Sequence, residues 1–418
     1  MQTVQLDNEV RQTTAPNGVV VLTERVPRVR SAALGIWVRA ASAHEPRRQM
    51  GISHLLEHMV FKGTERRTAR EIALALEVRG GSLDAYTSRD TTAFQARVVD
   101  ADLPRAVDVL TDLVRRPALR QADLDLERNV ILEEINTVLD TPDDLVFDLS
   151  SEALWPDHSY GFSILGTRES VGALSSNDLR ALHGRAYVPQ NCVIAGAGAL
   201  DHDAVLELLA REGWFDRPAP ANPPPLPPPA PAQRGKDVRH EKDTAQVHLV
   251  FATDTVPYSD KRRFALLVLS TVFGGGMSSR LFQRIREELG LAYAIYSFVS
   301  FFQSTGLAGV YVGTQPRTAP QAAEAIRGEF ARLAREGLRG AELAEAKAQT
   351  QGQLLLSLEA PAAKMYRLAS GAVFGDRYRT LDELQAAVGA LTEEDVAAVA
   401  AEYFSPERQT VVWLGPKA

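Results

Sequence analysis

Short apolar runs alternate along the chain with longer segments in which apolar residues recur at helical spacing. Residues 19–22 and 32–38 are rich in β-branched side chains, which predicts two strands. Residues 68–71, Thr-Ala-Arg-Glu, have the sequence of a capping box and predict a helix that stops at the glycine pair 80–81. The pattern predicts further elements in both halves: a strand over 83–98, a helix over 102–114, strands over 247–252 and 306–312, and helices over 318–336 and 340–357.

The pattern of the first half returns in the second half. Residues 173–189 align without gaps on residues 390–406, and each copy opens a helix with Ser or Thr followed three residues later by Asp. Each copy ends at a proline and then enters an apolar strand. A repeat of this length predicts two copies of one domain.

A proline-rich segment separates the two copies, with nine prolines among the fourteen residues from 218 to 231. Such a segment can join neither a helix nor a sheet ladder. We therefore expect a semi-rigid linker over 218–235, between an N-terminal domain (1–217) and a C-terminal domain (236–418). An SH3-type ligand is the alternative interpretation of these prolines.

The most informative polar residues are His54, Glu57 and His58, in the run His-Leu-Leu-Glu-His. Positions four apart lie on the same face of a helix, so both imidazoles can bind one Zn²⁺. The order His-x-x-Glu-His is the inverzincin signature. Apolar residues surround the three polar ones, which predicts a buried helix whose polar groups need a partner such as a metal. Two solvated histidines beside a surface glutamate are the alternative.

A third ligand is expected from a second helix that begins near Asp123. Glu127 and Glu134 are seven residues apart and share one face of that helix, beside its apolar stripe. Glu133 lies about 100° around the helix axis and is expected to be a solvated charge.

With these motifs the chain resembles the M16 metallopeptidases, the family of pitrilysin, insulin-degrading enzyme and the mitochondrial processing peptidase. The segment from Glu127 to Glu134 matches the downstream E-R-N-x-x-x-x-E-type segment of that family, and 75 residues separate His58 from Glu134. The resemblance implies one Zn²⁺ per chain, held by His54, His58 and Glu134. It implies that Glu57 is the general base on zinc-bound water and that Glu127 orients a ligating histidine.

Two further segments carry the resemblance. Residues 80–88 resemble the family's strand that pairs with the substrate backbone, which implies substrate contacts at Ser82, Asp84 and Ala85. The family often has Asn where this chain has Asp84. Residues 284–293 resemble the family's Arg/Tyr element, so Arg286 and Tyr293 are expected to hold substrate and stabilise the oxyanion. The alternatives are Arg280 in place of Arg286, and ordinary packing and surface charge.

The resemblance spans residues 10–415 and fits the short, bacterial, processing-peptidase-like branch of the family. It implies an α+β fold of two homologous domains, each a mostly antiparallel sheet flanked by helices, and excludes a doubly wound sheet. Residues 59–63 align with residues 271–275, which sets Leu266, Leu269 and Ser270 opposite His54, Glu57 and His58. The C-terminal domain is therefore expected to lack the metal site and to form another wall of the substrate cavity.

The composition is that of an ordinary soluble protein, with 45% hydrophobic residues, 24% charged residues and a net charge of −7. The acidic balance argues against a nucleic-acid partner. No apolar run reaches the ~20 residues needed to span a membrane, and the N-terminus does not resemble a signal peptide. Cys192 is the only cysteine, so an intrachain disulfide is impossible. Together these features favour a cytoplasmic protein.

The function that the resemblance implies is that of a zinc-dependent endopeptidase. It would cleave unfolded peptides or leader segments inside a closed chamber. Family members build that chamber from four such domains, so a homodimer, or a heterodimer with a related chain, is expected. The alternative is a non-catalytic peptide-binding or scaffolding subunit of a heterodimeric peptidase complex. The sequence does not indicate the physiological peptide.

Overall fold

The computed structural model describes residues 1–216, 226–227, 229–231 and 235–417. Contacts divide the chain into two compact units, and neither unit is continuous in sequence. Unit 1 contains Met1–Ile135, Ser163–Pro227 and Ser357–Tyr378, and unit 2 contains Asn136–Phe162, Pro228–Leu356 and Arg379–Ala418. The predicted linker, 218–235, falls mostly outside the described residues, and the predicted domain boundaries stay a prediction.

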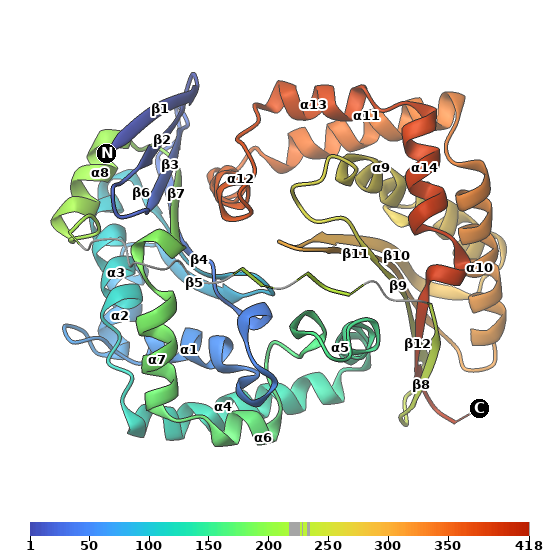
Figure 1. Cartoon of the computed structure of the whole chain (residues 1–418), viewed down its shortest axis with the longest axis horizontal. Coiled ribbons are helices and arrows are strands. Elements are labelled where there is room, and N and C mark those ends of the chain that lie inside the picture. The colour runs from blue at the N-terminus through green and yellow to red at the C-terminus, as the bar shows by residue number, and fades with distance from the viewer. Residues whose placement is uncertain (217–225, 228, 232–234, 418) are drawn as a thin grey trace. The chain divides into compact units, whose positions relative to one another are not determined.

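Unit 1 is built on a seven-stranded sheet with the order β1-β2-β3-β7-β4-β6-β5 (Figure 1). Neighbouring strands are antiparallel except β3 and β7, which are parallel. The strands are β1 (Gln2–Asp7), β2 (Val10–Thr14), β3 (Val20–Arg25), β4 (Ser31–Val38), β5 (Ser82–Thr87), β6 (Thr92–Val99) and β7 (Cys192–Gly198).

The predicted single strand over 83–98 is wrong, because the structure has the hairpin β5–β6 there. The turn closes where the backbone N–H of Ser88 donates to the carbonyl of Thr91, at 2.8 Å. Ser88 Oγ donates to the same carbonyl, at 3.0 Å. Local hydrogen bonds of Ser side chains favour turns, and here they interrupt a run whose pattern otherwise predicts one strand.

Helices cover both faces of the unit 1 sheet. Apolar side chains on one face of β3, β4, β6 and β7 pack with helices from the N-terminal half in the main core. Alternate residues of the same strands point to the other face, where they pack against α12. The helices of this unit are α1 (Ile52–Val60), α2 (Ala69–Glu77), α3 (Leu103–Arg115), α6 (Arg168–Ala173), α7 (Ser176–Ala186), α8 (His202–Arg211) and α12 (Pro361–Val373).

Unit 2 has a five-stranded sheet with the order β10-β11-β9-β12-β8, in which only β12 and β8 are parallel. Its strands are β8 (Asp237–Glu241), β9 (Val247–Thr255), β10 (Ala292–Phe301), β11 (Gly306–Thr314) and β12 (Thr410–Gly415). Its helices are α5 (Pro142–Leu154), α9 (Arg263–Gly274), the π-helical turn Phe282–Glu288, α10 (Ala319–Glu336), α11 (Gly340–Ser357), α13 (Leu381–Gly389) and α14 (Glu393–Tyr403).

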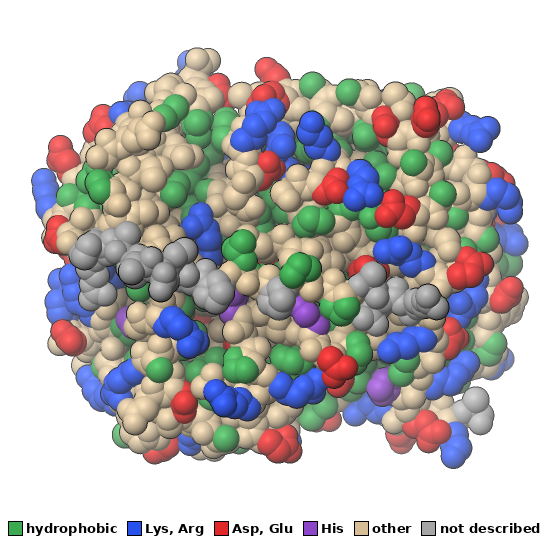
Figure 2. Space-filling view, in the orientation of Figure 1, with side chains coloured by type: hydrophobic (Ala, Val, Ile, Leu, Met, Phe, Trp, Pro, Cys, Tyr) green, Lys and Arg blue, Asp and Glu red, His purple; other side chains and the backbone are tan. Residues whose placement is uncertain are grey.

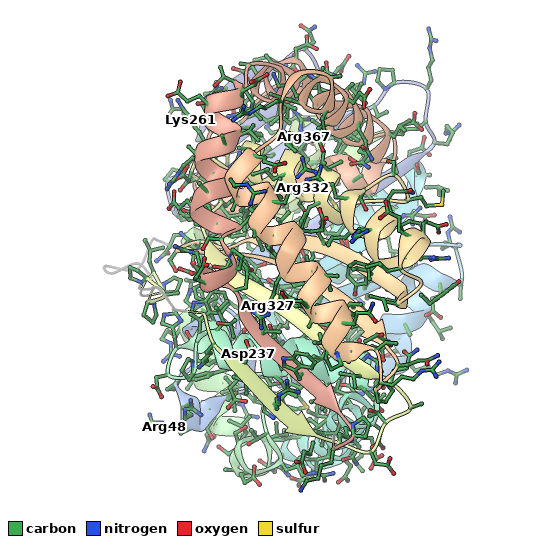
Figure 3. All side chains as sticks on the ribbon, turned by 90° about the vertical axis from the view of Figure 1, so that its right-hand side faces the viewer. Arg48, Asp237, Lys261, Arg327, Arg332 and Arg367 are labelled. Carbon is green, nitrogen blue, oxygen red and sulfur yellow. The ribbon has the colours of Figure 1, made fainter. Side chains whose placement is uncertain are left out.

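One face of the unit 2 sheet packs against α5, and the other packs against α9, α10 and α14. On the outside of this unit, Arg327 of α10 bonds to the carboxylate of Asp237 on β8, at 2.7 Å (Figure 3). Acidic and basic side chains are interspersed over the face of the molecule that Figure 2 shows.

The predicted repeat is visible in the strand order. The sequence β3-β7-β4-β6-β5 in unit 1 matches β8-β12-β9-β11-β10 in unit 2, with the parallel pair at the same place. Capping boxes open the equivalent helices, Ser175 with Asp178 at α7 and Thr392 with Asp395 at α14. The predicted α+β class, with two homologous and mostly antiparallel domains, is confirmed.

The repeats exchange one helix each, a feature that sequence reasoning did not predict. Helix α4 (Gln121–Asp140) is followed by α5, which packs on β9 and β12 of unit 2. In the second half, α11 is followed by α12, which packs on β7, β4 and β3 of unit 1. No helix among the described residues combines the length and apolar character needed to cross a membrane.

Candidate metal centre

Helix α1 presents two histidines on one face. Leu55, Leu56 and Met59 are fully buried in the main core of unit 1 and fix the rotation of the helix. His54 and His58, four residues apart, then point the same way, and their ring centroids lie 4.6 Å apart.

Helix α4 brings Glu134 to these histidines. His54 Nε2 lies 3.7 Å from one carboxylate oxygen of Glu134, and His58 Nε2 lies 3.7 Å from the other. Among the residues that the structure describes, these three form the one group of His, Cys, Asp and Glu side chains placed to hold a metal, with ligand atoms within 4.8 Å of one another. Zinc bonds of ~2.0–2.1 Å in a tetrahedron separate ligand atoms by about 3.3 Å, so the arrangement suits zinc.

Glu127, seven residues before Glu134 on α4, holds His58 in place. Its Oε1 lies 2.9 Å from His58 Nδ1. A carboxylate only accepts hydrogen bonds, so Nδ1 carries the proton and Nε2 stays free to bind a metal. The other oxygen, Oε2, lies 2.5 Å from the ammonium of Lys62.

The charges in this group shift one another's pKa values. Burial alone would raise the pKa of Glu127, but the hydrogen bonds from His58 and Lys62 outweigh it and the pKa is lowered. Burial likewise opposes the charged form of His58, yet Glu127 and the neighbouring carboxylates raise its pKa. Burial, and then the nearby His58, lower the pKa of His54 to about 4, so His54 is a neutral imidazole at neutral pH, as metal binding requires.

Glu57 lies on α1 between the two histidines in sequence, and its side chain is 9% exposed. Thr87 Oγ1, at the end of β5, donates to Glu57 Oε2 at 2.5 Å. Burial raises the pKa of the Glu57 carboxyl against the effect of that hydrogen bond. A carboxylate with a raised pKa, held in place by one hydrogen bond, has the properties of a general base.

The strand β5 is the last strand of its sheet and pairs only with β6 among the described strands. It contains Ser82, Asp84 and Ala85, the three residues predicted to contact substrate. Ala85 packs with the core on the α1 side, whereas Tyr86 packs on the α12 side. Because side chains alternate along a strand, the exposed Asp84 shares the face of Tyr86 and points away from Glu57.

The structure also brings Arg286 and Tyr293 together in unit 2. Arg286 donates to the carbonyl of Tyr293 at 2.9 Å, and its guanidinium lies 4.4 Å from the centre of the Tyr293 ring. The side chain of Tyr293 is 79% exposed. Arg280, the alternative, is instead held by Glu342, at 2.7 and 2.8 Å, and is nearly buried. The arginine beside the tyrosine is therefore Arg286.

Comparison with known proteins shows the family to which the chain belongs. The chain is 36% identical to an uncharacterized zinc protease of Streptomyces coelicolor, over 97% of this chain and 90% of the relative. It is also 36% identical to the uncharacterized zinc protease YmxG of Bacillus subtilis, over 95% of this chain and 96% of that protein. The chain belongs to the M16 peptidase family. Its predicted place in the short bacterial branch is confirmed by these relatives.

Two family descriptions match consecutive stretches of the chain. "Insulinase (Peptidase family M16)" matches residues 20–168, and "Peptidase M16 inactive domain" matches residues 173–350. Among solved structures, a protease from Helicobacter pylori shares the fold with a TM-score of 0.91 and 23% identity, over 97% of this chain and 99% of that chain. An M16 structure from Pseudomonas fluorescens has a TM-score of 0.89 and 21% identity, with 98% of both chains covered.

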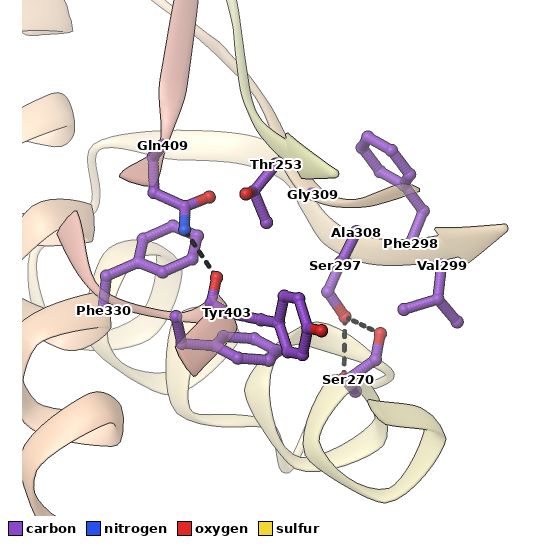
Figure 4. Close-up of a pocket in the computed structure, with 11 residues that line it drawn as sticks. Thr253, Ser270, Ser297, Phe298, Val299, Ala308, Gly309, Phe330, Tyr403 and Gln409 are labelled. Atoms are coloured by element: carbon purple, nitrogen blue, oxygen red, sulfur yellow. Dashed lines mark hydrogen bonds between the residues drawn. The ribbon is translucent and has the colours of Figure 1, made fainter. Parts of the chain in front are cut away.

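In the second repeat, the positions that align with His54, Glu57 and His58 carry no metal-binding side chain. Leu266 and Leu269 of α9 are fully buried, and Ser270 bonds to Ser297 of β10 with 2.9 Å between their hydroxyl oxygens. Ser270 also lines a core cavity of about 10 Å³, together with Phe330 and Tyr403, among others (Figure 4). The positions that align with His54 and Glu57 therefore carry buried apolar side chains in unit 2.

Sequence reasoning missed two residues of the centre, Lys62 and Thr87. Lys62 lies just beyond the end of α1, so only the folded structure shows that its ammonium reaches Glu127. Thr87 follows Ala85 by two positions on β5, which sets it on the α1 side, but only the folded hairpin shows that it reaches Glu57.

Proposed function

We propose that this chain is a zinc-dependent endopeptidase that cleaves unfolded peptides or leader segments, with Glu57 as general base. The observation that carries the proposal is the convergence of His54, His58 and Glu134 beside Glu57. The donor set of two imidazoles and one carboxylate is that of known catalytic zinc sites, which leave one coordination position open. Relatives named as zinc proteases support the same conclusion.

When bound, Zn²⁺ would lower the pKa of water towards ~7 and polarise the scissile carbonyl. The chain's own residues supply the remaining chemistry. Glu57 takes a proton from the attacking water and passes it to the leaving amine, while Thr87 holds one carboxylate oxygen in place. Glu127 keeps His58 in the tautomer that leaves Nε2 free.

The free edge of β5 is proposed to bind the peptide backbone as an added strand, which gives affinity with modest sequence preference. Arg286 and Tyr293 are proposed to hold the substrate and stabilise developing negative charge, because they present a guanidinium and an exposed phenol side by side. A dimer, of identical chains or with a related chain, a closed chamber and a cytoplasmic location belong to the same proposal.

The decisive experiment compares Glu57→Gln with the wild type. Zinc content is measured by atomic absorption, and cleavage is measured with a quenched fluorescent peptide. We expect E57Q to keep its zinc and to lose ~10²–10⁴-fold in turnover, the usual contribution of a general base. Glu134→Gln is expected to lose zinc, whereas Glu133→Gln, one position away and exposed on the same helix, is the matched control that keeps zinc and activity.

Wild-type turnover in zinc-loaded E57Q would refute the base assignment. Full zinc in E134Q would remove Glu134 from the ligand set. A wild-type chain that binds zinc and peptide, but shows no chelator-sensitive cleavage, would favour the non-catalytic peptide-binding subunit instead.

A further inference from the structure

The helix that carries both histidines has no cap of its own. Its N-cap residue is Gly51, with φ of +89°, and it provides no side-chain oxygen. A Cβ at this position would lie 2.5 Å from the carbonyl oxygen of Leu165. Both the left-handed backbone and the close carbonyl favour glycine, so the first N–H groups of α1 need an acceptor from elsewhere.

Glu45, six residues before Gly51 and outside the helix, provides that acceptor. Its Oε2 accepts from the backbone N–H of Gly51 and its Oε1 accepts from the backbone N–H of Ser53, each at 2.8 Å. Glu45 is only 6% exposed. A carboxylate is also the favoured charge at a helix N-terminus, because the peptide dipoles point their positive ends towards it.

The two histidines differ in what fixes their rings. His58 has its Nδ1 held by Glu127. The Nδ1 of His54 is buried and has no hydrogen-bond partner among the described residues. The direction of His54 Nε2 therefore depends on the backbone of the first turn of α1, and Ser53, which Glu45 binds, directly precedes His54.

The loop that carries Glu45 also holds the hairpin that ends β5. The N–H of Ala43 donates to the carbonyl of Arg89 at 2.7 Å, and Ser42 Oγ donates to the carbonyl of Ser88 at 3.4 Å. These contacts fasten the β5–β6 turn, next to Thr87, to the same loop that caps α1. The helix with the ligands and the strand with Thr87 therefore share one anchor.

We propose that Glu45 is a positioning residue of the metal centre, which fixes the first turn of α1 and thereby aims His54 Nε2 at the metal position. The inference rests on the proposed zinc site. An ordinary helix cap, which only stabilises the fold, would leave the intrinsic affinity for zinc unchanged. The zinc affinity therefore distinguishes a positioning role of Glu45 from a purely structural one.

The test compares Glu45→Gln with Thr68→Ala. The amide of E45Q is nearly the same size as the carboxylate but offers only one acceptor oxygen. Thr68 caps α2, which carries no metal ligand, so T68A removes a cap elsewhere in unit 1 and serves as the matched control. Zinc affinity is measured by competition with a chromophoric chelator, and the unfolding temperature is measured on the same samples.

We expect E45Q to lose ~10–100-fold in zinc affinity, the usual effect of removing a residue that orients a metal ligand. T68A is expected to keep wild-type affinity although it also loses stability. Wild-type zinc affinity in E45Q would overturn the proposal. Equal losses of affinity in both variants would overturn it too, because general destabilisation would then explain the effect.

Hydrogen–deuterium exchange of the zinc-free proteins gives a second readout. In E45Q, we expect faster exchange in peptides that cover residues 51–58, with unchanged protection in β4 and α3. Loss of protection throughout unit 1 would overturn the proposal, because Glu45 would then support the whole unit. If the wild type binds no zinc, the proposed function fails, while this exchange experiment still tests the link between Glu45 and α1.

Discussion

Replacing Lys62 with methionine tests how far the centre depends on residues beyond its ligands. The two oxygens of Glu127 each hold one donor, His58 Nδ1 at 2.9 Å and Lys62 Nζ at 2.5 Å. Glu127 is 6% exposed and Lys62 is 35% exposed at their side chains. In K62M the apolar stem of the side chain remains, but Glu127 loses the ammonium that now lies beside its Oε2.

The size of the effect follows from the type of bond. Hydrogen bonds to charged groups contribute ~1.5–3 kcal/mol, and the partial exposure of Lys62 sets this one at the lower end. Because about 1.4 kcal/mol corresponds to a tenfold change in binding, we expect K62M to bind zinc about tenfold more weakly. The loss reaches zinc through Glu127, which would hold His58 less firmly.

The measurement is a zinc titration in competition with a chromophoric chelator, at constant ionic strength. Lys62→Arg keeps a cationic donor, and its zinc affinity is expected to stay within a few-fold of that of the wild type. Arg70→Met, at an exposed position on α2, removes one positive charge away from the centre and is expected to have no effect. Wild-type affinity in K62M, or an equal loss in R70M, would refute the reasoning.

Two further predictions concern other parts of the chain. Asp112 is fully buried and accepts from Thr64, Arg66 and Arg67, and despite burial these bonds lower its pKa. The ionised carboxylate of Asp112 stabilises the fold above the pKa that Asp112 has in the unfolded chain. This stabilisation is lost as the pH falls through the lower pKa that Asp112 has in the folded protein. Asp112→Asn should therefore lower the free energy of unfolding, measured in urea, by ~3–5 kcal/mol at neutral pH. As the pH falls, this free energy should decrease less in the variant than in the wild type; parallel plots of the free energy of unfolding against pH for the two proteins would contradict this. Arg280→Ala should lower the unfolding temperature by breaking the pair with Glu342, whereas Arg286→Ala should leave it unchanged and reduce peptide turnover; the reverse result would exchange the two roles.

The fold class and the repeat could be predicted because their signals are local. Capping boxes at Ser175 and Thr392, and the apolar strands that follow them, lie at matching places in both halves. The exchange of α5 and α12 could not be predicted. An amphipathic pattern shows that a helix has an apolar face, but it does not show which of two similar sheets that face covers.

The grouping of the candidate metal ligands could be predicted for the same reason. His54 and His58 at i and i+4, and Glu127 and Glu134 seven apart, reveal shared helix faces through their spacing alone. Glu45, Lys62 and Thr87 act across elements, through contacts that depend on how a loop, a helix and a strand meet. The side-chain direction of Asp84 follows from strand alternation, but only once β5 is separated from β6.

The two repeats show why a shared fold can carry chemistry in one copy alone. In α1, two partly buried imidazoles and a buried carboxylate are costly unless partners satisfy them, and Glu134, Glu127, Thr87 and a metal would do so. In α9, Leu266 and Leu269 fill the same positions with apolar side chains, so packing alone satisfies the helix. The second repeat is therefore satisfied by packing, whereas the first has partly buried polar groups for which a bound cation would be a partner. This asymmetry between the repeats, rather than the fold that they share, makes α1 and α4 the candidate place for the chemistry.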